Sequence, residues 1–297
     1  MKHTGILLIL AAGCCWGTAP VFTNGLFEAG ATSFQVAGIR ALIACSFYWL
    51  VGLQKEGRKI LCSPKNAAML MVTGSISIGT MYLTYTFSML LFGASLAVIF
   101  LYTAPVYVAL YMAVTGRERV GILQVIGILL IMAGTTVSVG FAANMNKPTG
   151  VTVVVGIACG ISYALVTIFR KTIQANFSVF QVAAYTSLGA SIVLIPFLEL
   201  SSIPFNEKTC VCFLGNAIIS TALPQFLYLM GLDSDVPGAV GSSLAAIELI
   251  VAGICGVVLL GESTSLTKIT GLGIVFIGVV LAAQKKLSSG KSSNIGS

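Results

Sequence analysis

Two ionisable residues stand inside long apolar segments of this sequence, Glu248 and Arg40. An unpaired charge at the middle of a membrane-spanning helix costs about 2.5–3.5 kcal/mol on insertion scales. The two residues must therefore pair, bond to neighbouring hydroxyl groups, or face water. A buried structural pair is one interpretation. A counter-charge for a solute, or a carboxyl group that takes up and releases a proton, is the other, and the sequence leaves both open.

Polar side chains recur four residues apart in two further apolar segments, one around Ser77 and one that contains Asn216 and Tyr228. This spacing places them on one face of a helix. Hydrogen bonding between helices is one explanation, and a polar wall along a solute pathway is the other. Aromatic rings with a polar end also suit an amphipathic ligand. The predicted substrate-binding residues are Trp16, Arg40, Ser77, Tyr82, Tyr85, Asn216, Tyr228 and Glu248.

The sequence lacks the residue patterns that enzymes and metal sites need. His3 is the only histidine, no two cysteines form a Cys-x-x-Cys pair, and the carboxylates are not clustered. A metal site or an activated nucleophile would require such groups. A Walker-type glycine-rich loop is also missing, so ATP is not expected to drive the protein. We therefore predict no catalytic residue, no cofactor, no metal and no enzyme activity.

The elements that position these residues are apolar segments long enough to cross a bilayer. Of the 297 residues, 57% are apolar and 8% are charged, whereas a soluble domain has about 25% charged residues. A spanning helix needs about 20 apolar residues, so the length allows ten of them and no soluble domain. The predicted spans are 5–27, 33–53, 66–90, 94–115, 121–141, 150–170, 178–198, 209–230, 236–260 and 265–283.

The second five segments repeat the first five. Residues 34–37 recur as residues 180–183, and Trp16 recurs as Tyr163, while Glu118 recurs as Glu262. Because each repeat has an odd number of spans, the second copy must enter the membrane from the opposite side, as in many secondary transporters. The predicted fold is an all-α membrane protein of ten helices in two inverted repeats, residues 1–145 and 146–297 with a short basic tail.

Glycines predict where helices approach one another closely. Gly13-x-x-x-Gly17 in the first span has a counterpart, Gly156-x-x-x-Gly160, in the sixth. Small residues four apart allow close backbone contact between membrane helices. The fifth and tenth spans have matched glycines and few polar side chains, which predicts scaffold helices that face lipid or a second subunit. Pro105 and Pro224 lie mid-span and are expected to kink their helices.

The net charge of +7 is distributed unevenly. Counting loops from a cytoplasmic N-terminus places twelve Lys and Arg residues inside and three outside, with Arg40 within a span. The positive-inside rule therefore predicts that both termini are cytoplasmic. The basic tail is expected to lie near anionic lipid headgroups, and nucleic acid is not an expected partner.

Several motifs, in order and in both repeats, resemble the drug/metabolite transporter superfamily, in particular its EamA-type members with ten helices. The resemblance covers nearly the whole chain. Leu249 stands where a proline is common in that family, so an identical kink in the ninth helix is not implied. The matching motifs are Trp16-Gly17, Arg40 in residues 38–42, Pro105 followed by Gly116-Arg117-Glu118, and Glu248 followed by Leu259-Leu260-Gly261-Glu262.

The resemblance implies a secondary transporter of a small organic metabolite such as an amino acid or a related solute. We expect an exporter in the cytoplasmic membrane that works by alternating access, with its cavity between helices 1–4 and 6–9. Protons are the expected coupling ion, and a homodimer is compatible with the fifth and tenth helices. Uptake by the same fold is the alternative within transport. A non-transporting membrane scaffold is the alternative from another class, although it would not need polar stripes or deep charges.

Overall fold

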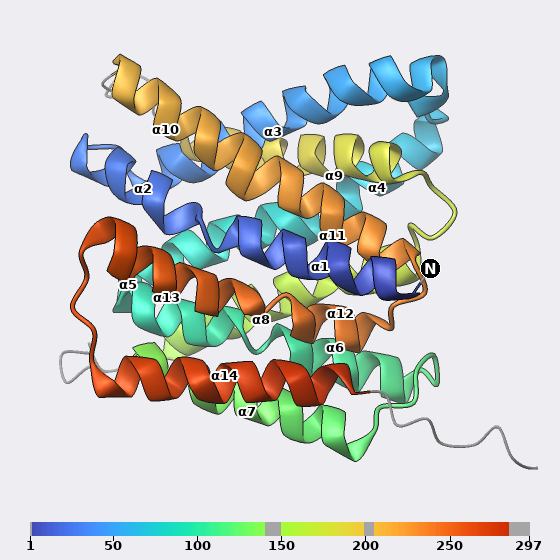
Figure 1. Cartoon of the computed structure of the whole chain (residues 1–297). Helices are drawn as coiled ribbons and strands as arrows, with labels where there is room; N and C mark the ends of the chain where they lie inside the picture. The colour runs from blue at the N-terminus through green and yellow to red at the C-terminus, as the bar shows by residue number, and fades with distance from the viewer. Residues whose placement is uncertain (1, 140–149, 199–204, 285–297) are drawn as a thin grey trace, which may run out of the picture.

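The computed structural model describes residues 2–139, 150–198 and 205–284. Over these ranges the protein is helical and contains no strand. Ten helical stretches are long and apolar enough to cross a membrane. Figure 1 shows them packed side by side in one bundle, with the start of α1 and the end of α14 at the same, right-hand end. The prediction of an all-α membrane protein with ten spans is confirmed.

Several spans consist of two successive helices. The first half contains α1 (Lys2–Trp16) with α2 (Ala19–Glu28), α3 (Ser33–Glu56), α4 (Pro64–Gly74) with the first part of α5 (Thr80–Leu101), the last part of α5 with α6 (Ala104–Val114), and α7 (Ile122–Val139). The second half contains α8 (Gly150–Lys171), α9 (Val179–Leu194), α10 (Glu207–Ala217) with α11 (Leu223–Asp233), α12 (Gly238–Leu244) with α13 (Ile247–Leu260), and α14 (Leu266–Ala283).

The boundaries of the spans agree with the sequence prediction, with one clear extension. The second span continues through α3 and a short 3₁₀ turn to Ile60, beyond the predicted end at residue 53. The third span ends at Leu91 and the fourth begins at Leu96, and between them Gly93, with a φ of 87°, interrupts α5. Glycine adopts this left-handed conformation without a steric penalty. The predicted end of the fifth span at residue 141 lies outside the described residues.

Three spans are interrupted near their middle. The first breaks after Trp16, the fourth after Leu101 and the ninth after Leu244. Pro105 is the second residue of α6 and so begins a new helix after a break, as the sequence prediction of a kink implied. The ninth span breaks although it has Leu249 in place of a proline. Backbone carbonyl groups that a break leaves free can line a solute site in the membrane interior.

Two other spans contain a matched π-helical segment. In the third span it covers Ser75–Gly79, and in the eighth it covers Ile218–Ala222. Short π segments are frequent at functional sites because the wider turn displaces the helix on either side. Hydroxyl groups bond across both segments, from Thr80 to the Ser75 carbonyl (3.0 Å) and from Thr221 to the Asn216 carbonyl (2.8 Å). Pro224 lies two residues after the end of the second segment, as the second residue of α11.

The matched glycines form close contacts between helices. A Cβ atom on Gly17 would lie 2.8 Å from the Glu248 carbonyl oxygen, and one on Gly160 would lie 2.7 Å from that of Phe100. Each glycine pair therefore packs a span of one half against a broken span of the other half. The fifth and tenth spans, α7 and α14, pack on each other through Gly127 and Gly278. The opposite orientation of the two halves, and their boundary near residue 145, stay predictions.

Candidate functional site

Glu248 occupies the start of α13, directly after the break in the ninth span. It is the only acidic residue in the first turn of that helix. The N-terminus of a helix has a partial positive charge, which favours a carboxylate at this position. Gly17 of the first span lies against the Glu248 backbone, since a Cβ atom there would clash with the carbonyl oxygen. The carboxyl group is therefore held at the point where two interrupted spans meet.

Arg40 approaches this region from α3 and forms no ion pair with a described residue. Its guanidinium carbon lies 4.1 Å from the centre of the Tyr82 ring, a cation–π geometry. Its Nε atom is buried and has no hydrogen-bond partner among the described residues. Arg40 interacts electrostatically with Glu248, but within the described chain no ion pair of ordinary length joins them. The structure therefore does not contain the direct buried ion pair between Arg40 and Glu248 that was one interpretation of the sequence.

Three tyrosines surround the Glu248 carboxyl group and interact with it electrostatically, namely Tyr85, Tyr102 and Tyr163. The buried Tyr102 hydroxyl has its hydrogen-bonding interaction with the Glu248 carboxyl group, although this contact does not have the geometry of an ordinary hydrogen bond. Tyr102 is therefore a neighbouring hydroxyl group that partly satisfies the carboxyl group, as one interpretation of the sequence expected.

Trp16 of the first span and Tyr228 of the eighth span lie in the same region as Arg40 and Glu248. Their ring centres are 5.4 Å apart and the rings are tilted by 58°. The Tyr228 hydroxyl shares a hydrogen bond of 2.6 Å with the hydroxyl of Thr167 on α8. Trp16, Tyr82 and Tyr163 pack against one buried apolar cluster that includes Tyr102 and Tyr228. We call Trp16, Arg40, Tyr82, Tyr85, Tyr102, Tyr163, Tyr228 and Glu248 the central cluster.

Two of the predicted residues are used differently. Ser77 is buried in the π segment and donates a hydrogen bond of 2.6 Å to the Thr73 carbonyl of its own span. Asn216 is fully buried, and neither polar atom of its side chain has a hydrogen-bond partner among the described residues. The structure thus brings six of the eight predicted residues into the central cluster, and among the described residues no hydrogen bond joins Ser77 or Asn216 to the other six.

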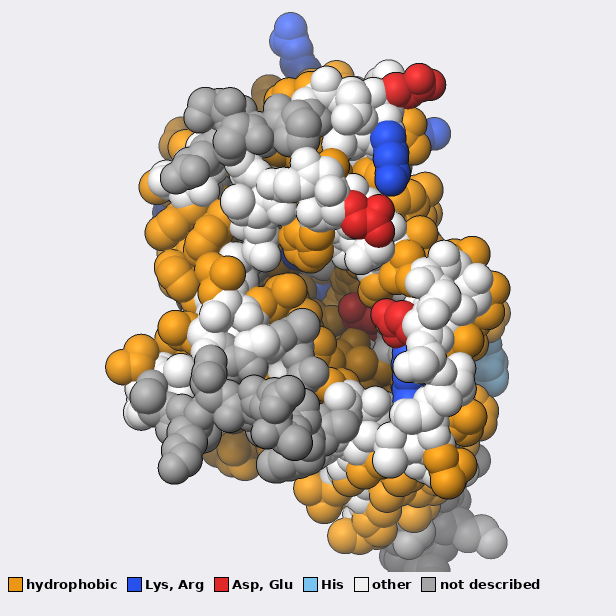
Figure 2. Space-filling view, turned by 90° about the vertical axis from the view of Figure 1, so that its left-hand side faces the viewer, with side chains coloured by type: hydrophobic (Ala, Val, Ile, Leu, Met, Phe, Trp, Pro, Cys, Tyr) orange, Lys and Arg blue, Asp and Glu red, His pale blue; other side chains and the backbone are white. Residues whose placement is uncertain are grey.

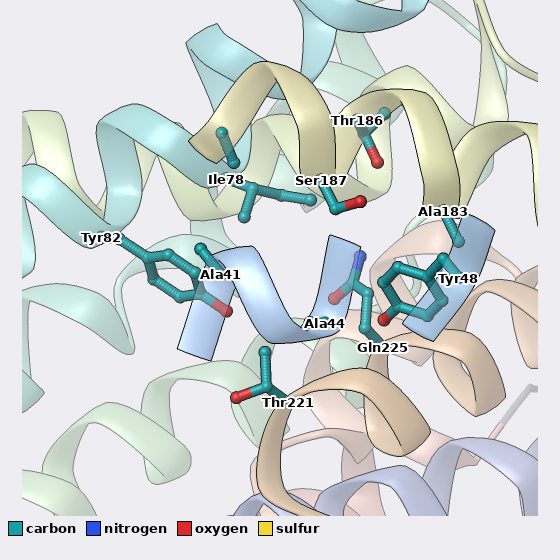
Figure 3. Close-up of a pocket in the computed structure, with 11 residues that line it drawn as sticks. Ala41, Ala44, Tyr48, Ile78, Tyr82, Ala183, Thr186, Ser187, Thr221 and Gln225 are labelled. Carbon is teal, nitrogen blue, oxygen red and sulfur yellow. The ribbon is translucent and has the colours of Figure 1, made fainter. Parts of the chain in front are cut away.

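A narrow pocket adjoins the central cluster at Tyr82. Figure 3 shows Tyr82 at one end of this pocket and Tyr48 toward the other, with the carboxamide of Gln225 between them. The cavity volume is small, about 20 Å³, although the open space between the lining atoms and the solvent is larger. Tyr82 interacts electrostatically with both Tyr163 of the cluster and Tyr48 of the pocket. The pocket, which we call the side pocket, is lined by Ala41, Ala44, Tyr48, Ile78, Tyr82, Ala183, Thr186, Ser187, Ala190, Thr221 and Gln225.

The end of the bundle opposite the start of α1 is hollowed. Figure 2 views this end and shows a depression near its centre, with acidic and basic side chains visible inside it. The ends of α2 and α13 and the start of α14 lie around this face in Figure 1. A polar interior that opens at one end of a membrane bundle can admit a solute from that side only.

The sequence prediction missed two members of the central cluster and most of the side pocket. Tyr163 could have been found, because it is the repeat counterpart of Trp16. Tyr102 lies in the motif before Pro105, but its closeness to Glu248 depends on the breaks in both spans. Gln225 and Ser187 of the side pocket lie on different spans, and no spacing in the sequence connects them.

Comparison with known proteins places the chain in a family. The model of the EamA-like transporter family matches residues 3–140 and again residues 150–284. The uncharacterized inner membrane transporter YicL of Salmonella typhimurium is 24% identical over 287 residues, which are 93% of this chain and 94% of that protein. An uncharacterized transporter of Archaeoglobus fulgidus is 28% identical over 189 residues, 63% of this chain and 66% of that protein.

A solved structure supports the same fold. One crystal structure of another protein superposes with a TM-score of 0.80 at 17% identity, and the match covers 95% of this chain and 97% of that chain. At this identity the likeness concerns the fold alone. The family match, in contrast, covers both halves of the chain and includes every residue of the central cluster. The chain belongs to the EamA-like transporter family and is a multi-pass membrane transporter.

Proposed function

We propose that the protein is a secondary transporter that exports a small zwitterionic metabolite, such as an amino acid or a related solute, across the cytoplasmic membrane by alternating access. The observation that supports this most directly is the presence of one guanidinium and one carboxyl group in the same aromatic enclosure without an ion pair between them. Charges inside a membrane protein need partners. A solute with an anionic and a cationic group supplies both partners at once.

Each part of the central cluster has a role in this proposal. Arg40 binds the anionic group of the solute, and Glu248 binds its cationic group. The rings of Trp16, Tyr82 and Tyr228 contact the apolar part of the solute, because aromatic residues offer large apolar faces with polar edges. The side pocket beyond Tyr82 has no charged residue in its lining, so it suits an uncharged part of the solute. The family itself does not specify which solute is moved.

Alternating access is supported by the interrupted spans and by the hollow at one end. Broken helices with a midplane site are the usual construction of such transporters. Under the positive-inside prediction the hollow in Figure 2 faces outward. Protons are the proposed coupling ion, with Glu248 as the group that takes them up. A homodimer through the fifth and tenth spans stays a prediction.

Purified protein in liposomes tests the proposal. Counterflow of labelled amino acids, compared with nucleosides and simple amines, should identify a zwitterionic substrate. Arg40→Gln and Glu248→Gln should each reduce counterflow, whereas Lys208→Gln, which removes an exposed cation, should not. Counterflow of the zwitterionic substrate at the parental rate in both variants would overturn the role of these residues. Flux into everted and right-side-out vesicles separates export from the alternative of uptake, and a scaffold would show no flux at all.

A further inference from the structure

A carboxylate joins the two halves at the end of the bundle where the chain begins. Glu118, which follows the fourth span, accepts hydrogen bonds from the backbone N–H groups of Gly238 (2.5 Å) and Ala239 (3.2 Å). These are the first two residues of α12, where the ninth span starts. The contact lies at the same end as the start of α1, because Gly5 packs against Val236. Bonds from a carboxylate to free amides at a helix start are strong and charge-assisted.

The repeat predicts the same contact at the opposite end, with the roles of the halves exchanged. Glu118 recurs as Glu262, an offset of 144 residues. The same offset maps Gly238 and Ala239 onto Ala94 and Ser95, the start of the fourth span directly after Gly93. Glu262 should therefore be able to accept bonds from the N–H groups of these two residues.

In this structure the Glu262 carboxylate has a different partner. Its carboxylate forms an ion pair of 2.6 Å with Lys268 of α14, and its side chain is 51% exposed. No other partner of this carboxylate occurs in the described part of the chain. The two ends thus contain matched parts, but among the described residues only Glu118 accepts such bonds, whereas Glu262 pairs with Lys268. The end with Glu262 is the end that is hollowed in Figure 2.

We propose that Glu118 and Glu262 are paired positioning residues of the transport cycle, each of which holds one end of the pathway closed. When the transporter changes to its inward-facing state, the hydrogen bonds from the N–H groups of Gly238 and Ala239 to Glu118 break. Glu262 then leaves Lys268 and accepts hydrogen bonds from the N–H groups of Ala94 and Ser95. This inference rests on the proposed alternating-access function. Each bond exists in one state only, so each carboxylate shifts the population toward the state in which it is bound.

The experiment measures the inward-facing fraction with one reporter cysteine. Ala239→Cys is introduced into a cysteine-free variant, because Ala239 is fully buried in this structure and becomes reachable when the end with Glu118 opens. Labelling by a membrane-impermeant maleimide is followed in vesicles that expose this end. Glu118→Gln and Lys268→Met should each raise the labelling rate, and Glu262→Gln should lower it. Each change should be about tenfold, the effect of losing one charge-assisted hydrogen bond from one state.

The test is specific because the two variants of one ion pair should change the labelling rate in opposite directions. Lys268→Met frees Glu262 for its proposed partners, whereas Glu262→Gln removes the acceptor charge, so a merely structural ion pair would give the same direction for both. Glu207→Gln is the matched control, because Glu207 is an exposed acid in the first turn of α10, and it should leave labelling unchanged. A Glu262→Gln rate equal to or above that of the parent, or no change in Lys268→Met, would overturn the proposal.

Solute counterflow in the same preparations separates this inference from the proposed function. If the labelling rates follow the expected order and the parent moves no amino acid, the roles of Glu118 and Glu262 are supported and the proposed solute class is wrong. If the parent moves amino acids and the labelling rates do not follow the expected order, the proposed function stands and the paired positions fail.

Discussion

The guanidinium of Arg40 lies 4.1 Å from the centre of the Tyr82 ring, at the wall between the central cluster and the side pocket. A ring face stabilises a cation by about 0.5–2 kcal/mol, depending on its exposure to water. The ring thus holds Arg40 in place without neutralising its charge, so the charge is available to a solute.

Tyr82→Phe and Tyr82→Leu distinguish the contribution of the Tyr82 ring to solute affinity from that of its hydroxyl group. Tyr82→Phe keeps the ring face, so its apparent solute affinity in counterflow should stay close to that of the parent. Tyr82→Leu removes the face and should weaken the affinity by about 2–30-fold, the equivalent of 0.5–2 kcal/mol. Equal losses in both variants would show that the hydroxyl group matters and the cation–π contact does not.

Glu248→Gln tests the coupling of transport to protons. The substitution keeps the shape of the side chain and removes its titration. Net transport driven by an imposed pH gradient should collapse, while insertion and folding survive and exchange of solute without a gradient is reduced but not abolished. Glu248→Ala should be more damaging, because Arg40 and the surrounding hydroxyls lose an interaction. Unchanged transport by Glu248→Gln with the parental pH profile would show that coupling lies elsewhere.

Asn216→Leu should separate stability from transport. The Asn216 side chain is fully buried with both polar atoms unpartnered among the described residues, and each such atom costs about 1–3 kcal/mol. Leucine has a similar volume and no polar atom, so the unfolding temperature in detergent should stay the same or rise. If Asn216 binds the solute, counterflow should fall at the same time. A lower unfolding temperature would instead indicate that water or lipid satisfies the amide.

Gly160→Ala should destabilise the interface between α8 and the broken fourth span. A methyl group there would overlap the Thr103 hydroxyl and lie 2.7 Å from the Phe100 carbonyl oxygen. Overpacking of this kind costs about 1–3 kcal/mol, which thermal unfolding in detergent can detect. Gly273→Ala is the matched control, because nothing lies within 4 Å of a Cβ atom at Gly273. Similar unfolding temperatures for both variants would contradict the close contact.

Cys62 provides a test of topology. It lies between the second and third spans, in a loop that the sequence predicts to be cytoplasmic. Burial raises the pKa of the Cys62 thiol above its ordinary value, and nearby Glu56 raises this pKa further. The thiolate is the reactive form, so a variant that keeps only this cysteine should react slowly at neutral pH and still gain rate at pH 9. An impermeant maleimide should label it from the cytoplasmic side only, and labelling from outside would reverse the predicted orientation.

The spans were predictable because each one depends on the apolar composition of its own continuous segment of the sequence. Every run of about 20 apolar residues must become a helix in lipid, since no other local structure satisfies its backbone. The breaks after Trp16 and Leu244 were not predictable in the same way. They depend on hydrogen bonds and packing between spans far apart in sequence, and the ninth span breaks without the proline that the family commonly has.

The central cluster was predictable to the extent that membrane location makes polar residues costly. Glu248 and Arg40 stood out for that reason, and their tyrosine neighbours were found through residue type. Tyr102 and Gln225 were missed because only the fold brings them beside Glu248 and Ser187. Ser77 was expected in a polar wall, but its hydroxyl satisfies a carbonyl of its own helix, which is a frequent role of serine in membrane helices.

The packing of Gly13 and Gly17 against α13 also constrains how the chain is made. Their partners, Ile247 and Val251, are synthesised more than 200 residues later, which takes about 10–50 s at 5–20 residues per second. The sixth span, by contrast, finds Phe100 already in the membrane when Gly160 arrives. The insertion machinery or lipid must therefore cover the small-residue face of the first span until the ninth span is complete.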